Sequence, residues 1–107
     1  MITLSQLLSS AGSGNSQEFS SITTTAVDKT LDVGEACFVT ASSKTITLPA
    51  SPSVGDKVAI GVNNFSDTLI SRNGENIMSL AENMTIDSPN LTITLLYVDT
   101  TIGWKLI

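Results

Sequence analysis

The chain has 107 residues, which is room for one domain, and its formal net charge is −5. It holds five basic residues, none next to another, which argues against nucleic acid as a partner because phosphate binding needs clustered Lys and Arg. Charged residues make up only 14% of the chain and aromatic residues 5%, and Ser, Thr and Asn fill the gap. This composition favours an all-β protein with many short connections.

The first residues differ from the rest. Leu4, Leu7 and Leu8 recur at the i, i+3, i+4 spacing of one helix face, and the Ser/Gly-rich stretch 9–16 has the composition of a flexible linker. Two interpretations stay open: a frayed terminus, or a segment that buries the three leucines on a partner. Three leucines on one face favour the second, so we assign residues 1–18 to a docking arm with its linker.

Short strands alternate with turns from residue 19 onward. Runs of β-branched and apolar residues are bounded by Gly, Pro, Asn and Asp, as expected for strands and their turns. The dipeptide Asn73-Gly74 predicts a two-residue hairpin, and Trp104 predicts a core side chain. The expected strands are 22–27, 36–40, 45–48, 57–62, 68–72, 77–80, 84–86, 91–98 and 104–107.

This spacing of short strands predicts a single antiparallel β-sandwich or barrel-like domain over residues 19–107, with a jelly roll among the arrangements it allows. Within the strand 91–98, we expect Leu91, Ile93, Leu95 and Tyr97 to share one face.

Cys37 is the only cysteine, and the chain has no histidine. An internal disulfide, a Cys/His metal site and a cysteine nucleophile with a histidine base are therefore excluded. We expect Cys37 to be a small buried hydrophobe. No apolar run reaches the roughly 18 residues that span a membrane, and the start lacks the features of a signal peptide, so we expect synthesis in a host cytoplasm and no membrane partner.

The acidic residues offer two candidate calcium clusters: Asp87 with Asn90 and Asp99, or Asp28 with Asp32. Neither has the spacing of a known calcium loop, which favours acids that are solvated at turns. No serine lies in a nucleophile-elbow pattern and no Gly-rich loop resembles a phosphate cradle. We therefore expect no enzyme, no catalytic residue, no cofactor and no metal.

One stretch carries a family resemblance. TITLPASPSVGDKV, residues 45–58, resembles a motif of a small trimeric β-domain family found in bacteriophage virion appendages, which includes tail-fibre tips and capsid decoration proteins. Later landmarks follow in that family's order: 68–70, then Arg72-Asn73-Gly74, the long strand from Leu91, and Gly103-Trp104. The similarity covers residues 22–107 and leaves the leucine arm uncovered. It implies a homotrimeric virion protein without catalysis.

No shaft repeats precede the β-domain, which favours a capsid decoration (cement) protein that the arm anchors to the major capsid protein or to another virion protein. The alternative is a tail-fibre tip or short appendage that recognises a host receptor or glycan, because loops on a rigid β-scaffold commonly carry such binding. The loop residues that would face a receptor are Asn63, Asn64, Phe65, Asp67, Glu82 and Asn83.

Overall fold

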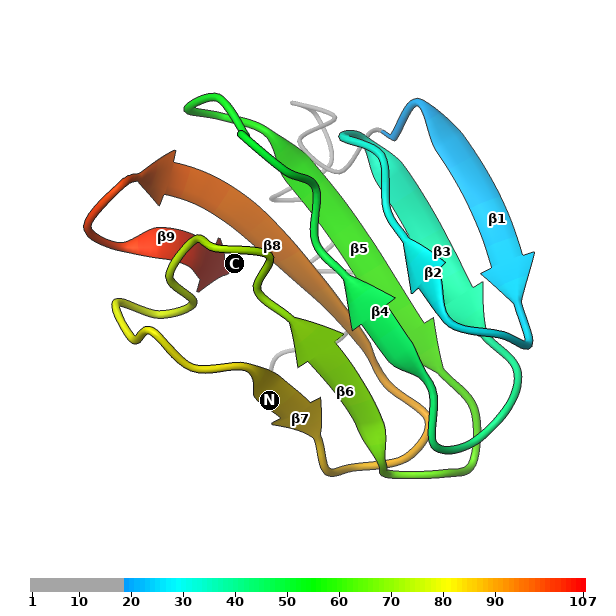
Figure 1. Cartoon of the computed structure of the whole chain (residues 1–107). Coiled ribbons are helices and arrows are strands. Elements are labelled where there is room, and N and C mark those ends of the chain that lie inside the picture. Colours follow the sequence, from blue (N-terminus) through cyan, green and yellow to red (C-terminus); the bar gives the residue numbers. More distant parts are fainter. Residues whose placement is uncertain (1–18) are drawn as a thin grey trace, which may run out of the picture.

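The computed structural model describes residues 19–107, which form two mixed β-sheets without a helix (Figure 1). No helix of the described residues is long and apolar enough to span a lipid bilayer. The predicted docking arm, including Leu4, Leu7 and Leu8, lies outside these residues. The first sheet, sheet A, contains in spatial order β1 (Ser21–Thr25), β3 (Glu35–Val39), β5 (Lys57–Val62), β8 (Thr92–Asp99) and β9 (Gly103–Leu106). The second, sheet B, contains β2 (Lys29–Thr30), β4 (Thr45–Thr47), β6 (Thr68–Ser71) and β7 (Met84–Ile86).

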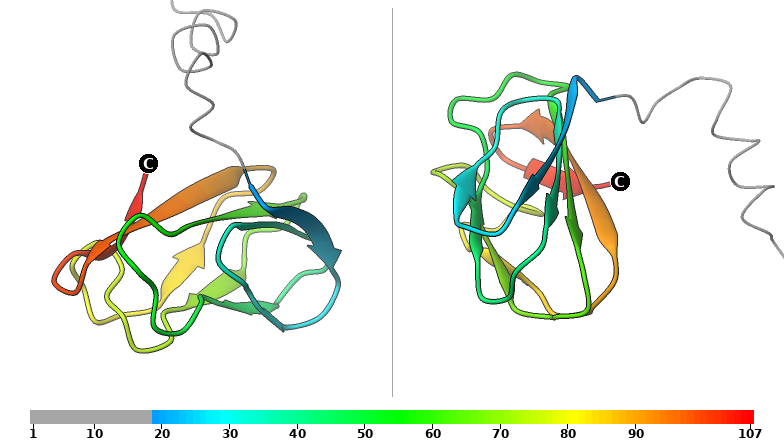
Figure 2. Two further views of the ribbon diagram at one scale, coloured as in Figure 1. Left: turned by 90° about the horizontal axis from the view of Figure 1, so that it is seen from above. Right: turned by 90° about the vertical axis from the view of Figure 1, so that its right-hand side faces the viewer.

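The chain winds as a coil between the two sheets, which face each other as two layers (Figure 2). From β1 to β6, each strand lies in the opposite sheet from the strand before it. Strands of successive coils therefore lie side by side and run parallel: β1 with β3, β3 with β5, β2 with β4, and β4 with β6. The last strands reverse this direction, because β7, β8 and β9 pair antiparallel with β6, β5 and β8.

The predicted all-β class is confirmed, but the predicted antiparallel pairing is wrong for β1 to β6. The short connections carry the chain across to the other sheet instead of back along the same one, so consecutive strands there do not become neighbours. No closed barrel forms among the described strands, because β1 and β9 are the two edges of sheet A and do not pair.

The turn at Asn73-Gly74 forms without the predicted hairpin. Both residues have positive φ, 51° and 89°, as a two-residue hairpin turn requires. The chain beyond it leaves sheet B, and Ile77 bridges to Trp104 instead. The antiparallel partner of β6 is β7, so the expected strand 77–80 is reduced to isolated bridges.

Side chains from both sheets fill one core between the layers. Cys37 lies beside Ile60 in sheet A, and Ile46 lies beside Ile70 in sheet B; all four are fully buried. The predictions for Cys37 and Trp104 are confirmed, since neither side chain is exposed. The ring of Trp104 meets that of Tyr97 edge-on, with centroids 5.4 Å apart. The predicted shared face of the long strand is confirmed, and the structure turns this face inward: Leu95 and Tyr97 are buried, and Leu91 and Ile93 pack against the core.

The stretch that carries the family resemblance forms the crossing from β4 to β5. Gly55 adopts a φ of 93°, and its N–H donates to the carbonyl of Tyr97 in β8 (2.9 Å). The Tyr97 N–H donates in turn to the Asp56 carbonyl (2.8 Å), and the Asp56 carboxylate accepts from the Ser53 N–H (2.7 Å). The Gly-Asp turn thus brings the chain from sheet B back to sheet A and attaches it to β8.

Gly103 begins β9 at a point where no side chain fits. Its φ is 70°, and an added Cβ would lie 1.9 Å from the carbonyl oxygen of Asn76, a backbone atom that cannot rotate away. We expect Gly103→Ala to lower the free energy of unfolding by about 2 kcal/mol or more, as measured by urea denaturation.

Gly74→Ala is the matched control, because Gly74 also has a positive φ (89°) but no atom within 4 Å of the added Cβ. This variant carries the conformational penalty without the clash, so it should lose only about 1 kcal/mol. Equal losses in the two variants would show that the contact with Asn76 is not what requires glycine at position 103.

Candidate functional site

The predicted receptor-facing loops lie far apart along the sheet. Residues 63–67 precede β6, whereas residues 82 and 83 precede β7. In this antiparallel pair, Thr68 lies beside Ile86 and Ile70 lies beside Met84. The two loops therefore occupy opposite ends of β6 and β7, and the structure does not bring their residues together into one surface.

Three of these loop side chains are engaged within the domain. Phe65 is half-buried and packs against the core. The Asp67 carboxylate accepts from the Ser43 hydroxyl (2.6 Å) and the Ser43 N–H (2.8 Å), and these bonds lower the pKa of Asp67. Asn83 accepts through Oδ1 from the backbone N–H of Arg72 (3.0 Å). Asn63, Asn64 and Glu82 are exposed, and the predicted docking leucines lie outside the described residues.

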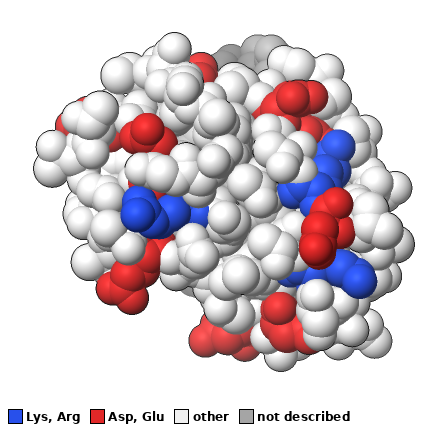
Figure 3. Space-filling model, viewed as in Figure 1, with Lys and Arg blue, Asp and Glu red and all other residues white. Residues whose placement is uncertain are grey.

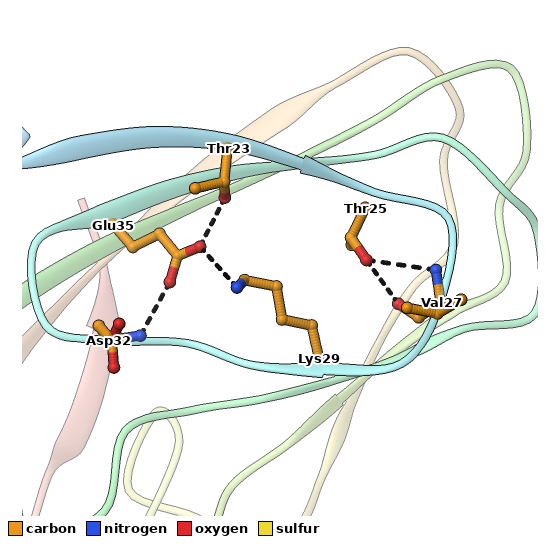
Figure 4. Close-up of polar contacts among 6 residues, drawn as sticks. All are labelled: Thr23, Thr25, Val27, Lys29, Asp32 and Glu35. Atoms are coloured by element: carbon orange, nitrogen blue, oxygen red, sulfur yellow. Dashed lines mark hydrogen bonds and ion pairs between the residues drawn. The ribbon is translucent and has the colours of Figure 1, made fainter.

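The interior holds a polar cluster around Glu35 (Figure 4). The Glu35 side chain is 1% exposed, and its Oε2 accepts from the Thr23 hydroxyl (2.5 Å) and lies 3.3 Å from Nζ of Lys29. Its Oε1 accepts from the backbone N–H of Asp32 (2.9 Å). The carboxylate thus joins β1, β2 and the turn before β3.

These contacts set the charge state of Glu35. Burial by itself would raise the pKa of the carboxyl, but the bonds from Thr23 and the Asp32 N–H and the cation of Lys29 together hold that pKa below its ordinary value. Burial raises the pKa of the neighbouring Cys37 thiol, which favours the protonated form. A carboxylate bonded on both oxygens beside a buried thiol stabilises the fold and presents no group to a substrate.

One acid of each candidate calcium cluster, Asp28 or Asp99, bonds to backbone amides. Asp28 accepts from the Thr45 N–H (2.9 Å), which links the β1–β2 turn to β4. Asp99 accepts from the N–H groups of Thr101 (2.9 Å) and Ile102 (2.6 Å) in the turn before β9. Within residues 19–107, no three acidic or cysteine side chains come together as metal ligands would.

An apolar groove adjoins β7, and its lining comes from the segment 77–87, from Leu91 and from residues of β8 and β9. Its larger hollow has a volume of about 360 Å³ and its smaller one about 140 Å³. Met84 and Thr85 line both hollows, and we call the two hollows together the β7–β9 groove. The other lining side chains are mainly apolar, among them Ile77, Met78 and Leu80 in the larger hollow and Leu91, Ile93 and Leu106 in the smaller.

The lining of this groove combines apolar and acidic side chains. Glu82 and Asp87 supply its acidic groups, and methionines line its centre, where their flexible thioethers adapt to varied shapes. Sequence reasoning missed the groove because the segment 77–87 meets residues of β8 and β9 there only once the strands have paired. The signal for the groove that the sequence did offer was the position of Met78 and Leu80 among polar residues; both side chains are exposed in the structure.

No protein-family model matches the chain, and no curated protein matches it.

The Glu35 cluster predicts an acid-dependent loss of stability. Because the folded-state pKa lies below the ordinary value, the carboxylate contributes stability above that ordinary value and loses it as the pH falls through the folded-state pKa. Glu35→Gln should lower the free energy of unfolding at pH 7 by about 1–3 kcal/mol and flatten its dependence on pH in the acid range, as measured by urea titrations at several pH values.

Glu82→Gln provides the matched control, because Glu82 is an exposed residue beside the groove. Its stability curve should follow that of the wild type. An acid dependence that is unchanged in Glu35→Gln would mean that another carboxyl dominates the acid response.

Proposed function

We propose that this protein is a structural component of a bacteriophage particle, a homotrimeric capsid decoration protein that its N-terminal arm anchors to the major capsid protein or to another virion protein. The observation that carries the proposal is the stretch at residues 45–58, which resembles the virion β-domain family. In this chain the same stretch makes the crossing between the sheets, where Gly55 and Asp56 bond to β8. The resemblance therefore falls on residues with a defined structural task.

The chemistry of the described residues supports a structural role over a catalytic one. The buried carboxylate of Glu35 forms an ion pair with Lys29, and the Cys37 thiol is enclosed in the core. On the face drawn in Figure 3, acidic and basic groups are interspersed, without the basic stripe that nucleic acid would require. We further propose that the facing sheets constitute a β-sandwich, although a jelly roll would require antiparallel neighbours in place of the parallel ones of β1 to β6.

The exposed apolar side chains support self-association. Ile22 is 76% exposed, Val27 64% and Leu80 56%, and all three are large enough to gain free energy from burial against another chain. A domain of this size also has a modest core, which association commonly supplements.

The proposed attachment of the protein to the particle depends on the burial of the three leucines of the arm. Burying Leu4, Leu7 and Leu8 on a shell protein would contribute about 1.5–3 kcal/mol each, before the cost of ordering the linker. A trimer carries three arms, and linking several weak sites raises avidity by roughly 10² to 10⁴-fold. The arms together would therefore hold the β-domain on the particle.

The trimer and its location are both measurable. Light scattering of the purified protein should return the mass of three chains over a range of concentrations, and quantitative mass spectrometry of purified virions should count hundreds of copies. A handful of copies per particle would assign the protein to a tail appendage with a host-recognition role instead. A monomeric mass at every concentration, with no trimer on particles, would contradict the homotrimer.

The anchoring role of the arm is tested by removing its leucines. Deletion of residues 1–16, or the triple change of Leu4, Leu7 and Leu8 to Ser, should leave the β-domain folded and trimeric but abolish binding to undecorated particles. Circular dichroism, light scattering and a particle co-sedimentation assay measure the three properties.

Ile2→Ser is the matched control, because Ile2 is apolar but stands outside the leucine spacing. It should bind particles as the wild type does. Full occupancy by the truncated protein would show that the β-domain itself makes the contact, and unfolding on truncation would assign the leucines to the protein's own core.

A further inference from the structure

The outer face of sheet A carries one row of neighbouring residues that crosses all five strands. Cys37 and Ile60 lie in the core, so the residues before them in β3 and β5 point to the outer side of the sheet. Strand pairing, and a hydrogen bond from the N–H of residue 107 to the carbonyl of residue 94 (3.0 Å), extend this row to both edges. In spatial order, the row consists of Ile22, Ala36, Ala59, Thr94 and Ile107.

This row is high at its two ends and low in the middle. Ile22 is 76% exposed and Ile107 57%, whereas the small side chains of Ala36 and Ala59 are 4% and 3% exposed. The row is bordered on one side by the ring of Phe38, which lies across Gly61 of β5, and on the other side by Leu96 of β8. We call this surface the sheet A trough and define it by Ile22, Ala36, Phe38, Ala59, Leu96 and Ile107.

The trough contains no acidic side chain, although the protein as a whole has a net charge of −5. The charged residues beside it are Lys57 and Lys105, which pair with Leu96 from its two sides. The outer face of sheet B differs, because its paired residues Thr30, Thr47 and Ser71 are polar. The exposed apolar surface of the trough is therefore suited to an uncharged, apolar occupant.

The chain that precedes β1 starts from this same face. The ring of Phe19 lies 5.3 Å from Nζ of Lys57, and Lys57 points outward because Val58 beside it is in the core. The ten residues 9–18 separate Leu8 from Phe19, and fully extended they would reach about 33 Å. The trough crosses four strand spacings, about 19 Å. The leucines before this linker are therefore within reach of every part of the trough of their own chain.

We propose that the leucine segment, residues 2–8, covers the sheet A trough of its own chain in the free protein. Leu4, Leu7 and Leu8 then bury apolar area on the low floor of the trough, between the isoleucines at its ends. Residues 2–17 include no charged residue, so this contact buries no charge.

The tether selects the trough of the same chain over that of another copy. It holds the leucines near their own domain at an effective concentration on the order of millimolar. The β7–β9 groove is a second apolar site, but its residues Leu91 and Ile93 lie on the core-facing side of the sheet, whereas Phe19 meets Lys57 on the outer side. The proposal concerns the free protein and does not depend on the role in a particle. Any other surface that binds the leucines has to displace them from the trough.

Cross-linking within one chain tests the contact. In the full chain, Ser5→Cys labels the segment without removing a leucine, and Thr92→Cys labels the outer face beside Gly61. A flexible bismaleimide should join the two thiols within a single chain. Changing Leu4, Leu7 and Leu8 to Ser should slow this reaction at least about fivefold, because the apolar contact is lost. Mass spectrometry of peptides identifies the joined residues.

Ser5→Cys/Thr30→Cys is the matched control. Thr30 is an exposed threonine like Thr92, but it lies on the outer face of sheet B. This pair should react slowly, and at the same rate with the three leucines or with serines in their place. Cys37 should stay unmodified in every variant, because it is fully buried.

A charge in the trough should have the same effect as the loss of the leucines. Ile22→Glu/Ile107→Glu places a carboxylate at each end of the trough and should slow the cross-link to Thr92→Cys by a similar factor. Val54→Glu should leave the rate unchanged, since Val54 is 75% exposed but lies in the β4–β5 connection, away from the trough. Circular dichroism confirms that each variant folds.

Three results would overturn the proposal. The first is an equal rate with and without the leucines, and the second is an equal rate at Thr92→Cys and Thr30→Cys. The third is a leucine-dependent product that joins two chains, which would place the segment on a neighbouring copy. The role in a particle is tested by the copy number on virions, so either proposal can fail while the other stands.

Discussion

The carboxylate of Glu35 holds the first coil of the chain to the rest of the domain. It accepts from Thr23 in β1, pairs with Lys29 in β2 and accepts from the Asp32 N–H in the turn that follows. β1 and β2 are the end strands of their sheets, so each gains packing and hydrogen bonds from one neighbour only. A buried carboxylate that lost these partners would be left uncompensated, and β1 and β2 would lose the contact that joins them.

The same coil explains why a domain with a well-packed core leaves apolar side chains outside it. In a coil of parallel strands, each turn of chain buries its side chains against the next, and the terminal turn has no neighbour. Ile22, Val27 and Val33 are exposed at that terminal turn. At the other end, the chain covers the β9 edge with the segment after Ile77 but leaves the β7–β9 groove open. The fold itself therefore leaves apolar side chains exposed at both ends of its two sheets.

The sequence offers no clear catalytic or ligand-binding motif, and in the structure several of its polar side chains bond to the backbone instead. The polar side chains that sequence patterns offer as ligands or receptor contacts include several that bond to backbone: Asp28 to Thr45, Asp99 to Thr101, and Asn83 to Arg72. Each such bond satisfies an amide of a turn or strand end, which short strands leave unpaired in large number. These side chains therefore stabilise the connections of the fold.

The sequence by itself determined the positions of most strands. Period-two alternation located β5 and β8 and put Leu95 and Tyr97 on one face, and Asn73-Gly74 adopted its turn, because backbone preference acts over a few neighbouring residues. Only the tertiary structure decided which strands became neighbours, and with them the Glu35 cluster and the β7–β9 groove. Alternation shows that a face is buried but not which strand lies beside it. The partners of β1 to β6 are separated by a whole coil of chain, and no local signal specifies that parallel pairing.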